Sequence, residues 1–137
     1  MNFLNQEVNM AAMQWIAVGC GAAIGAWIRW GLSILFAVSN LPVATLIANL
    51  TGGFLMGVSM AYFAQSSDQH TLRLFVMTGF LGGLTTFSAF SAEALSMLHK
   101  QQYAWVAIHI SSHVIGSLLM TALGFALMQY GRSNAVL

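Results

Sequence analysis

Apolar residues in this chain fall into four long blocks separated by short polar stretches. The blocks cover approximately residues 13–38, 43–64, 72–98 and 103–130. Each is near or above the ~20 residues that a helix needs to cross the hydrocarbon layer of a membrane. The pattern therefore predicts an all-α integral membrane protein with four transmembrane helices in a single membrane domain, residues 1–137.

Composition agrees with this class. Of the 137 residues, 58% are hydrophobic and 5% are charged, and the mean hydropathy is +0.78. A soluble domain of this length could not hide so much apolar surface behind so few charges. The net charge of +1 is too small for a nucleic-acid surface. No nucleotide motif or catalytic triad is recognisable, so we do not expect an enzyme.

The ends of the chain carry little information of their own. Residues 1–12 are mixed and polar, and we expect a frayed lead-in to the first helix. Glu7 lies there with no Lys or Arg beside it, which argues against a cleaved signal peptide. Cys20 is the only cysteine, so no disulfide can form within the chain.

Positive charges are divided evenly between the two ends of the predicted helices. With four spans both termini share one side, which holds Arg73 and Arg132, while Arg29 and Lys100 fall on the other. The positive-inside rule then gives a tie, which predicts weak orientation preference and allows insertion in both directions. The alternative is that the N-terminal amine or a partner fixes the orientation. Because the chain has no internal repeat, an inverted second copy would supply the missing half of a symmetric pathway, and we expect an antiparallel homodimer.

The third block, from Gly79 to Glu93, is too polar for a segment that only crosses lipid. Gly82 and Gly83 are followed by Thr85 and Thr86, whose hydroxyls can take over freed backbone groups. This predicts a break in the third helix at membrane depth, where inward carbonyls could hold a monovalent cation. The alternative is that the two glycines only allow close helix contact.

Beyond the break, Phe87 and Phe90 are three residues apart and share a face with Glu93. A neighbouring hydroxyl row is formed by Thr85, Ser88 and Ser91. Ring edges are electropositive and hydroxyls donate hydrogen bonds, so this face could hold a small anion. Phenylalanines that simply face lipid are the alternative, although such a stripe would not normally alternate with serine. Glu93 must be paired, protonated or close to water.

Two residues of the earlier blocks have two interpretations each. Asn49 lies well inside the second block, where its amide serves either as glue between helices or as a donor lining a pore. Arg29, between Trp27 and Trp30, fits the headgroup level or the mouth of an anion path. The small-xxx-small spacing in Gly21–Gly25 favours plain helix packing.

The fourth block carries a polar stripe at intervals of four residues. Its members are His109, His113, Ser117 and Thr121. Histidines at this spacing could share a metal, but no Cys or carboxylate accompanies them on this block. The stripe therefore favours a track of donors that faces the third helix.

Three motifs, taken together, carry a resemblance to the Fluc family of fluoride channels. They are Gly25-Ala26-x-x-Arg29-Trp30, Thr45-Leu46-x-x-Asn49 and Gly82-Gly83-Leu84-Thr85-Thr86-Phe87-Ser88-Ala89-Phe90-Ser91-x-Glu93. The likeness covers all four blocks in order, and the third motif is the specific one. Two departures are noted: many relatives carry Tyr and Ser where this chain has His109 and His113, and Thr is commoner at Ala89.

The resemblance implies a dual-topology antiparallel homodimer in the bacterial inner membrane that passively exports F⁻ through two pores. It implies a structural Na⁺ on the dimer axis, held by backbone carbonyls of Gly82 and Thr85. The pore residues that it implies are Asn49, Thr86, Phe87, Ser88, Phe90, Glu93, His113, Ser117 and Thr121, with Arg29 at a vestibule. The physics is compatible, since a strongly hydrated anion needs many donors, and formal positive charges would hold it too tightly.

Two other functions remain open. A proton-coupled small multidrug exporter would use an intramembrane carboxylate, for which Glu93 is the candidate. Exporters of that kind resemble one another, however, in having the acid on the first helix. The third possibility is an accessory subunit that transports nothing.

Overall fold

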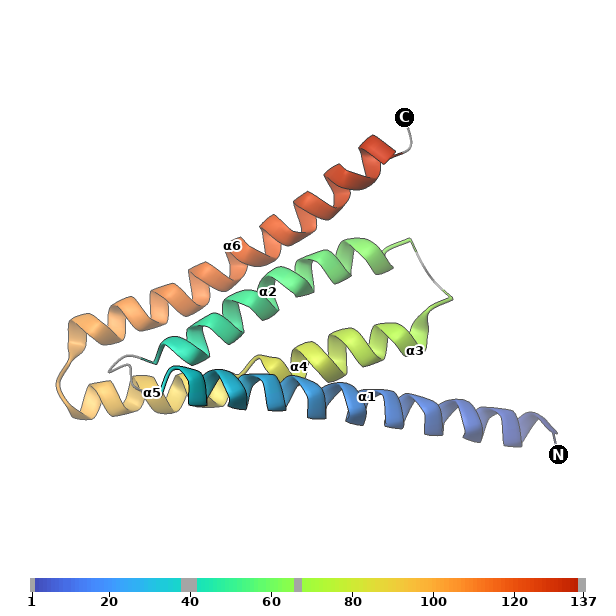
Figure 1. Ribbon diagram of the computed structural model, residues 1–137, viewed down its shortest axis with the longest axis horizontal. Helices are drawn as coiled ribbons and strands as arrows, with labels where there is room; N and C mark the ends of the chain where they lie inside the picture. The colour runs from blue at the N-terminus through green and yellow to red at the C-terminus, as the bar shows by residue number, and fades with distance from the viewer. Residues whose placement is uncertain (1, 38–41, 66–67, 136–137) are drawn as a thin grey trace.

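The computed structural model describes residues 2–37, 42–65 and 68–135, and all regular secondary structure in these residues is helical. It contains four helical spans that are long and apolar enough to cross a membrane, as the block pattern predicts. The spans lie side by side, with both termini at the same end (Figure 1). The helices are α1 (Asn2–Leu35), α2 (Val43–Phe63), α3 (His70–Arg73), the π-helix η1 (Leu74–Leu81), α4 (Gly82–Leu84), α5 (Phe87–His99) and α6 (Tyr103–Ala135).

Helix α1 is longer than the sequence pattern predicts. It begins at Asn2, so the prediction of a frayed lead-in over residues 1–12 is wrong from Asn2 onward. No glycine or proline interrupts this lead-in, and nothing there ends the helix. At 34 residues α1 is about 51 Å long, against a hydrocarbon layer of about 30 Å. Its N-terminal end, with the exposed Glu7, extends past the other helices (Figure 1). The predicted end at residue 38 lies outside the described residues.

Helix α2 starts where the proline predicts. Pro42 precedes the first residue of the helix, where its missing N–H is not needed. The predicted turn at Ser39 and Asn40 lies outside the described residues. At the far end of α2 the loop is shorter than the predicted Gln65–Thr71, because α3 already begins at the exposed His70; residues 66–67 are not described.

Helix α6 runs to Ala135, past the predicted end at residue 130, so the expected solvated tail is helical as far as it is described. Arg132 in this last turn donates hydrogen bonds to the carbonyls of Ala61 and Tyr62, at 3.0 and 3.1 Å. These carbonyls end α2 and have no helical donor of their own. The extension of α6 is therefore stabilised by capping its neighbour.

Glycines bring α1 against the first half of the third span. A Cβ at Gly25 would meet backbone atoms of Phe80 and Leu84, and a Cβ at Gly79 or Gly83 would meet the backbone of α1. The two helices therefore touch through their main chains, as small-xxx-small spacing allows. Packing, the favoured interpretation of Gly21–Gly25, is confirmed. Helices α2 and α6 pack in the same way at Gly57 and Gly124.

The third span is broken, as predicted, but not at its glycines. Gly82 and Gly83 are helical, and the chain becomes extended only at Thr85 (φ −82°, ψ 154°) and Thr86 (φ −151°, ψ 121°). Gly83 serves the close helix contact that was the alternative interpretation, whereas a Cβ at Gly82 would meet open space. The break is therefore set by the two threonines and their partners.

The turn between α5 and α6 ends α5 with a left-handed residue. Gln101 has φ 56°, and its N–H bonds to the carbonyl of Leu98, while the N–H of Gln102 bonds to the carbonyl of Met97. This is the Schellman arrangement, in which glycine is usually preferred at the left-handed position. The following helix starts directly afterwards, so the hairpin is tight.

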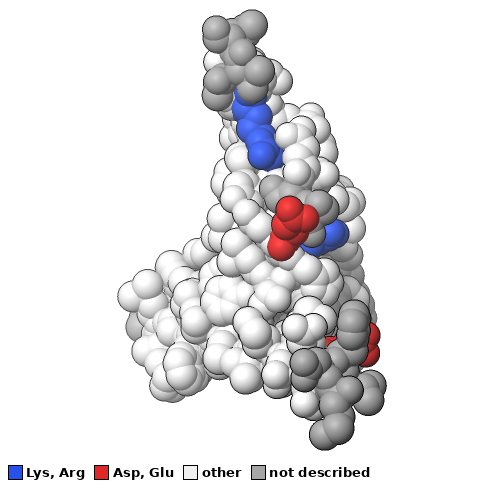
Figure 2. All heavy atoms as spheres, turned by 90° about the vertical axis from the view of Figure 1, so that its right-hand side faces the viewer, with Lys and Arg blue, Asp and Glu red and all other residues white. Residues whose placement is uncertain are grey.

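The surface of the single chain is largely apolar. Seen from the end that holds both termini, charged side chains are few and scattered (Figure 2). Large apolar side chains are exposed on every span, among them Trp15, Trp27, Met60, Phe87, Leu118 and Tyr130. Such a surface suits lipid or another membrane protein chain.

Candidate functional site

The hydroxyls of the two threonines at the break both bond to the backbone. The Thr86 hydroxyl accepts from the N–H of Ala89 at 3.2 Å and so caps α5. The Thr85 hydroxyl donates to the carbonyl of Leu81 at 2.8 Å, but this carbonyl also accepts from the N–H of Thr85 at 3.0 Å, so it had not lost its helical donor. The prediction that the hydroxyls take over freed backbone groups is therefore confirmed for Thr86 only.

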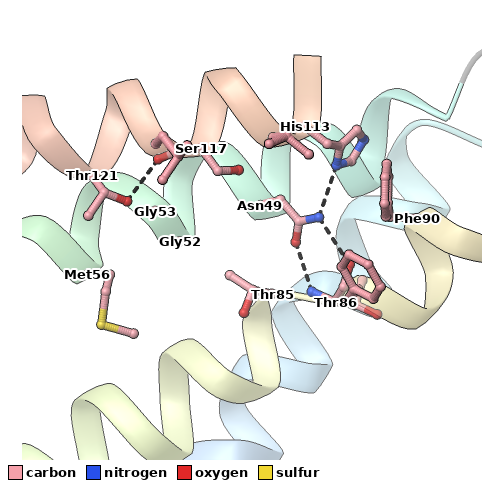
Figure 3. A pocket seen from close by; sticks show the side chains of 13 residues that line it. Asn49, Gly52, Gly53, Met56, Thr85, Thr86, Phe90, His113, Ser117 and Thr121 are labelled. Atoms are coloured by element: carbon pink, nitrogen blue, oxygen red, sulfur yellow. Dashed lines mark hydrogen bonds between the residues drawn. The ribbon is translucent and has the colours of Figure 1, made fainter. Parts of the chain in front are cut away.

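Asn49 holds the break against α2. Its Oδ1 accepts from the backbone N–H of Thr86 at 2.8 Å, and its Nδ2 donates to the carbonyl of the same residue at 3.1 Å. The Nδ2 also lies 3.1 Å from Nδ1 of His113 (Figure 3). Asn49 therefore joins α2, the break and α6, and it lines the adjoining cavity as well. The role as glue between helices is confirmed, and the role as a donor that lines a pore stays a prediction.

These bonds also assign the tautomer of His113. The two hydrogen bonds between the Asn49 amide and the backbone of Thr86 fix which end of the amide is NH₂. Nδ2 is therefore the donor toward His113. Nδ1 of a neutral His113 must then accept, and its Nε2 carries the hydrogen. This assignment rests on the hydrogen-bond network, the usual basis for placing imidazole protons.

The break also frees carbonyl oxygens. In a continuous helix the N–H groups of Thr86 and Ala89 would bond to the carbonyls of Gly82 and Thr85. Here these two N–H groups bond to Asn49 and to the Thr86 hydroxyl instead. The carbonyls of Gly82 and Thr85, the pair assigned to a cation by resemblance, have thus lost those helical donors.

Arg29 forms a hydrogen bond next to the break. Its Nε donates to the carbonyl of Gly83 at 3.2 Å. The flanking Trp27 and Trp30 are 69% and 65% exposed, so the rings point out of the chain while the guanidinium turns toward the break. Arg29 also borders a hollow of about 520 Å³ that Glu93 reaches from the other side. The Arg29 side chain therefore does not extend away from the helices toward the headgroup level.

The two phenylalanines beyond the break are neighbours with different surroundings. Their ring centroids are 5.3 Å apart. Phe90 is 7% exposed and stacks on His109 and His113, at centroid distances of 5.1 and 4.8 Å. Phe87 is 77% exposed. The ring of Phe90 is therefore held by contacts within the chain, whereas the ring of Phe87 is free to contact lipid or a partner.

Glu93 is paired, as a carboxyl group at this depth requires. Its Oε1 accepts from the hydroxyl of Thr45 at 2.5 Å, and its Oε2 lies 3.6 Å from Nε2 of His109. His109 Nε2 also lies 3.3 Å from the carbonyl of Phe90. Both histidines are buried, with 8% and 5% exposure for His109 and His113. Thr45 was not predicted as a partner of Glu93. Its spacing of four residues from Asn49, which places both on one face of α2, was the available signal.

An open cavity of about 450 Å³ adjoins this network (Figure 3). Three of the four spans contribute to it, and α1 does not. Its lining residues are Asn49, Gly52, Gly53, Met56, Thr85, Thr86, Phe87, Phe90, His113, Val114, Ser117, Leu118 and Thr121. Seven of the nine expected pore residues thus line one cavity, and Ser88 and Glu93 do not.

The hydroxyl rows are less continuous than the sequence suggests. Ser88 shares a hydrogen bond with Thr86, but the hydroxyls of Ser91 and Thr121 donate to carbonyls four residues back in their own helices. The fourth-helix stripe also divides. Its histidines face α5 as expected, whereas Ser117 and Thr121 lie against Gly53 of α2. The prediction that the whole stripe faces the third span is therefore wrong for its second half, because α6 packs along α2.

The donors at this site carry no formal charge apart from the nearby Arg29. Residues with amide, hydroxyl, imidazole and aromatic side chains border one open cavity. Such a set can replace part of the water shell of a small anion.

Comparison with known proteins identifies the family. The model of the CrcB-like protein family, described as Camphor Resistance (CrcB), matches residues 16–125. A protein of Cupriavidus pinatubonensis is 50% identical over 122 residues, which cover 84% of this chain and 94% of that protein. One of Nitrosospira multiformis is 50% identical over 117 residues, covering 83% and 91%. One of Pseudomonas aeruginosa is 48% identical over 118 residues, covering 84% and 93%. Each of the three is named "Fluoride-specific ion channel FluC". This four-span membrane chain therefore belongs to the CrcB-like protein family.

Proposed function

We propose that this protein is a fluoride-selective channel that lets F⁻ leave the cytoplasm passively across a bacterial inner membrane. The observation that carries the proposal is the likeness over most of its length to proteins named as fluoride-specific channels. The uncharged donors around the cavity at Asn49 support it independently. Nothing in this role requires catalysis, so the protein acts as a channel and not as an enzyme.

The donors have distinct parts in this proposal. The hydroxyls of Ser88, Ser117 and Thr121 can rotate toward a passing ion. Both hydrogens of the Asn49 amide are held by Thr86 and His113, and Nε2 of His113 is buried, so these two groups donate to the ion only if their present contacts change. Phe87 and Phe90 offer ring edges. Thr86, as the backbone partner of Asn49, holds the amide in place. Because no site presents a full positive charge on the path, fluoride is bound and still released.

A second, inverted copy completes the path in this proposal. The cavity at Asn49 is open on one side, and Phe87 at its edge is 77% exposed. The even division of Arg and Lys between the two ends supports insertion in both directions. An antiparallel homodimer would place Phe87 of each chain against its partner and give two equivalent pores.

We further propose that a Na⁺ ion lies where the two breaks meet, held by the carbonyl oxygens of Gly82 and Thr85. Their release from helical bonding makes them suitable ligands, since monovalent cations in membrane proteins are held by backbone carbonyls. Bound sodium would supply positive charge beside the path. The carbonyl of the neighbouring Gly83 already has a donor in Arg29, so it is not needed as a ligand.

Fluoride efflux from proteoliposomes tests the function. Vesicles loaded with fluoride, with chloride, or with a cationic dye and a proton gradient would each receive the purified protein. Rapid fluoride release without chloride release or proton coupling is expected. Dye movement driven by the proton gradient would favour an exporter that uses Glu93, and no transport by folded protein would favour an accessory subunit.

A further inference from the structure

Three side chains with metal-binding atoms meet behind Phe90. Glu93 on α5 and His109 and His113 on α6 each place one such atom within 4.8 Å of the other two. The Glu93 Oε2 to His109 Nε2 distance is 3.6 Å, and the two imidazole centroids are 4.5 Å apart. Helix α6 has no carboxylate of its own beside these histidines, and Glu93 of the neighbouring α5 supplies one.

Two atoms of this cluster lack a hydrogen-bond partner among the described residues. They are Oε2 of Glu93 and Nε2 of His113, and both are buried. His113 as a whole is 5% exposed. Buried polar atoms are seldom left unpaired, since each costs about 1–3 kcal/mol. Both atoms belong to residues whose metal-binding atoms lie within 4.8 Å of one another, so one bound ion would satisfy both.

The donor set selects the kind of ligand. Two imidazoles and one carboxylate, with a fourth position open, form a common environment for Zn²⁺ and related ions. Mg²⁺ and Ca²⁺ prefer several oxygen ligands, and this cluster offers one carboxylate. Tetrahedral ligands at the usual bond lengths are about 3.3 Å apart. Side-chain rotations that shorten the separations of up to 4.8 Å by about 1.5 Å would bring the observed atoms to that spacing.

Two residues of the cluster border open space. His113 borders the cavity of about 450 Å³, and Glu93 borders the hollow of about 520 Å³ beside Arg29. Because the two unpaired atoms themselves are buried, an ion that arrives through either space reaches them only after a side chain of the cluster moves.

Metal binding would change the hydrogen bonding of Asn49. A metal on Nε2 of His113 leaves the proton on Nδ1. Nδ1 currently accepts from the Asn49 amide at 3.1 Å, and the protonated atom could not. An occupied site therefore releases His113 from Asn49 and alters the wall of the cavity.

We propose that Glu93, His109 and His113 form a binding site for a divalent first-row transition ion such as Zn²⁺, and that its occupation slows fluoride passage. The first part stands on the geometry alone. The second part rests on the proposed function.

Cobalt absorption tests the site on the purified protein after removal of any affinity tag. Co²⁺ titration should give the visible bands of a tetrahedral ion at one equivalent per chain, and Zn²⁺ should abolish them. His109→Gln and His113→Gln should each weaken binding more than about tenfold. A His70→Gln/His99→Gln double variant removes the exposed histidines and should bind like the parent. Bands that persist in both cluster variants, or that vanish in the control, overturn the proposal.

A second variant covers the case in which the glutamine variants do not fold. His113→Cys supplies a thiolate, and cobalt bound there should add a near-ultraviolet charge-transfer band. Cobalt binding without this band would overturn the assignment of His113.

Fluoride efflux with and without Zn²⁺ then tests the second part. A metal-free rate establishes whether the protein conducts, and a fall of about tenfold or more at saturating Zn²⁺ is expected, restored by a chelator. Metal binding in a protein that conducts no fluoride would overturn the proposed function and leave the site intact. Unchanged efflux at full Zn²⁺ occupancy would overturn the blocking role.

Discussion

The two halves of the third span pack by different means. Before Thr85, η1 and α4 lie against α1 through glycines, and the contacts are backbone to backbone. Beyond Thr86, α5 is held by directional hydrogen bonds and ring contacts to α2 and α6, such as the Glu93 contact with Thr45. The position of the first half depends on glycines, which have no side chain to hold the helices apart. The position of the second half depends on polar and aromatic side chains and their particular partners.

This difference separates two tasks. Close glycine packing fixes where the span lies, because a rigid backbone contact tolerates no added atom. The polar half then decides what the site can bind, since each donor and acceptor has a particular partner. Substitutions in the two halves should therefore fail in different ways: loss of assembly before the break, and loss of transport with the fold retained beyond it.

The largest effect is expected from Gly25→Val. A Cβ at this position meets backbone atoms of Phe80 and Leu84, which no rotamer change can relieve. The cost should exceed the ~1–3 kcal/mol that is typical of overpacking, and folded protein should be lost. Size-exclusion elution in detergent and thermal unfolding measure this.

Gly31→Val is the matched control, because a Cβ there meets nothing within 4 Å. It should elute and unfold like the parent. If Gly25→Val also behaved like the parent, the glycine contact would not be what positions the third span.

Asn49→Leu should have the next largest effect. It leaves the N–H of Thr86 without its partner, at about 1–3 kcal/mol, and removes one donor from the carbonyl of the same residue, which as the N-cap of α5 also accepts the first bond of that helix. We expect folded protein with a lower unfolding temperature and fluoride efflux reduced about 30-fold or more, since 1.4 kcal/mol corresponds to tenfold. Efflux at the parental rate would show that the break needs no support from α2.

Thr45→Val should act in the same direction but less strongly. It keeps the shape of the side chain and removes the hydroxyl that donates to Glu93 at 2.5 Å. Hydrogen bonds to carboxylates contribute about 1.5–3 kcal/mol, and an accessible carboxyl can recover part of this from water. Efflux should fall several-fold, and Thr45→Ser should restore it. Equal rates in the valine and serine variants would exclude a role for the hydroxyl.

The smallest effect is expected from Gln101→Gly, and it should be stabilising. Gln101 has φ 56°, a conformation that glycine adopts without the steric cost of a Cβ. The free energy of unfolding should rise by about 0.5 kcal/mol, with efflux unchanged, because the residue lies in the α5–α6 turn away from the cavity. A lower unfolding temperature would contradict this.

Local signals in the sequence predicted much of the fold. The length of the apolar blocks gave four spans, the glycine spacing gave the α1 contact, and the run from Gly82 to Thr86 gave a broken third span. Each of these depends on residues close together in the chain. The length of α1 escaped prediction because polar residues without a helix breaker can continue a helix beyond the membrane.

The parts that escaped prediction depend on residues distant in sequence. The break falls at Thr85 and Thr86 because Asn49, 37 positions away, takes both backbone groups of Thr86. The Thr45 to Glu93 bond spans 48 positions. No pattern within one apolar block identifies a partner on another block. These contacts could be predicted only once it was known which spans pack against each other.

The most direct test of the account is fluoride efflux by Phe90→Ile at equal amounts of folded protein in liposomes. Phe90 is the ring that the chain itself fixes, against His109 and His113 at the polar half of the span. Isoleucine fills space but has no electropositive ring edge. The account predicts a fall of about 100-fold in fluoride efflux, equivalent to about 2.7 kcal/mol, with folded protein retained. Parental efflux from folded Phe90→Ile would contradict it.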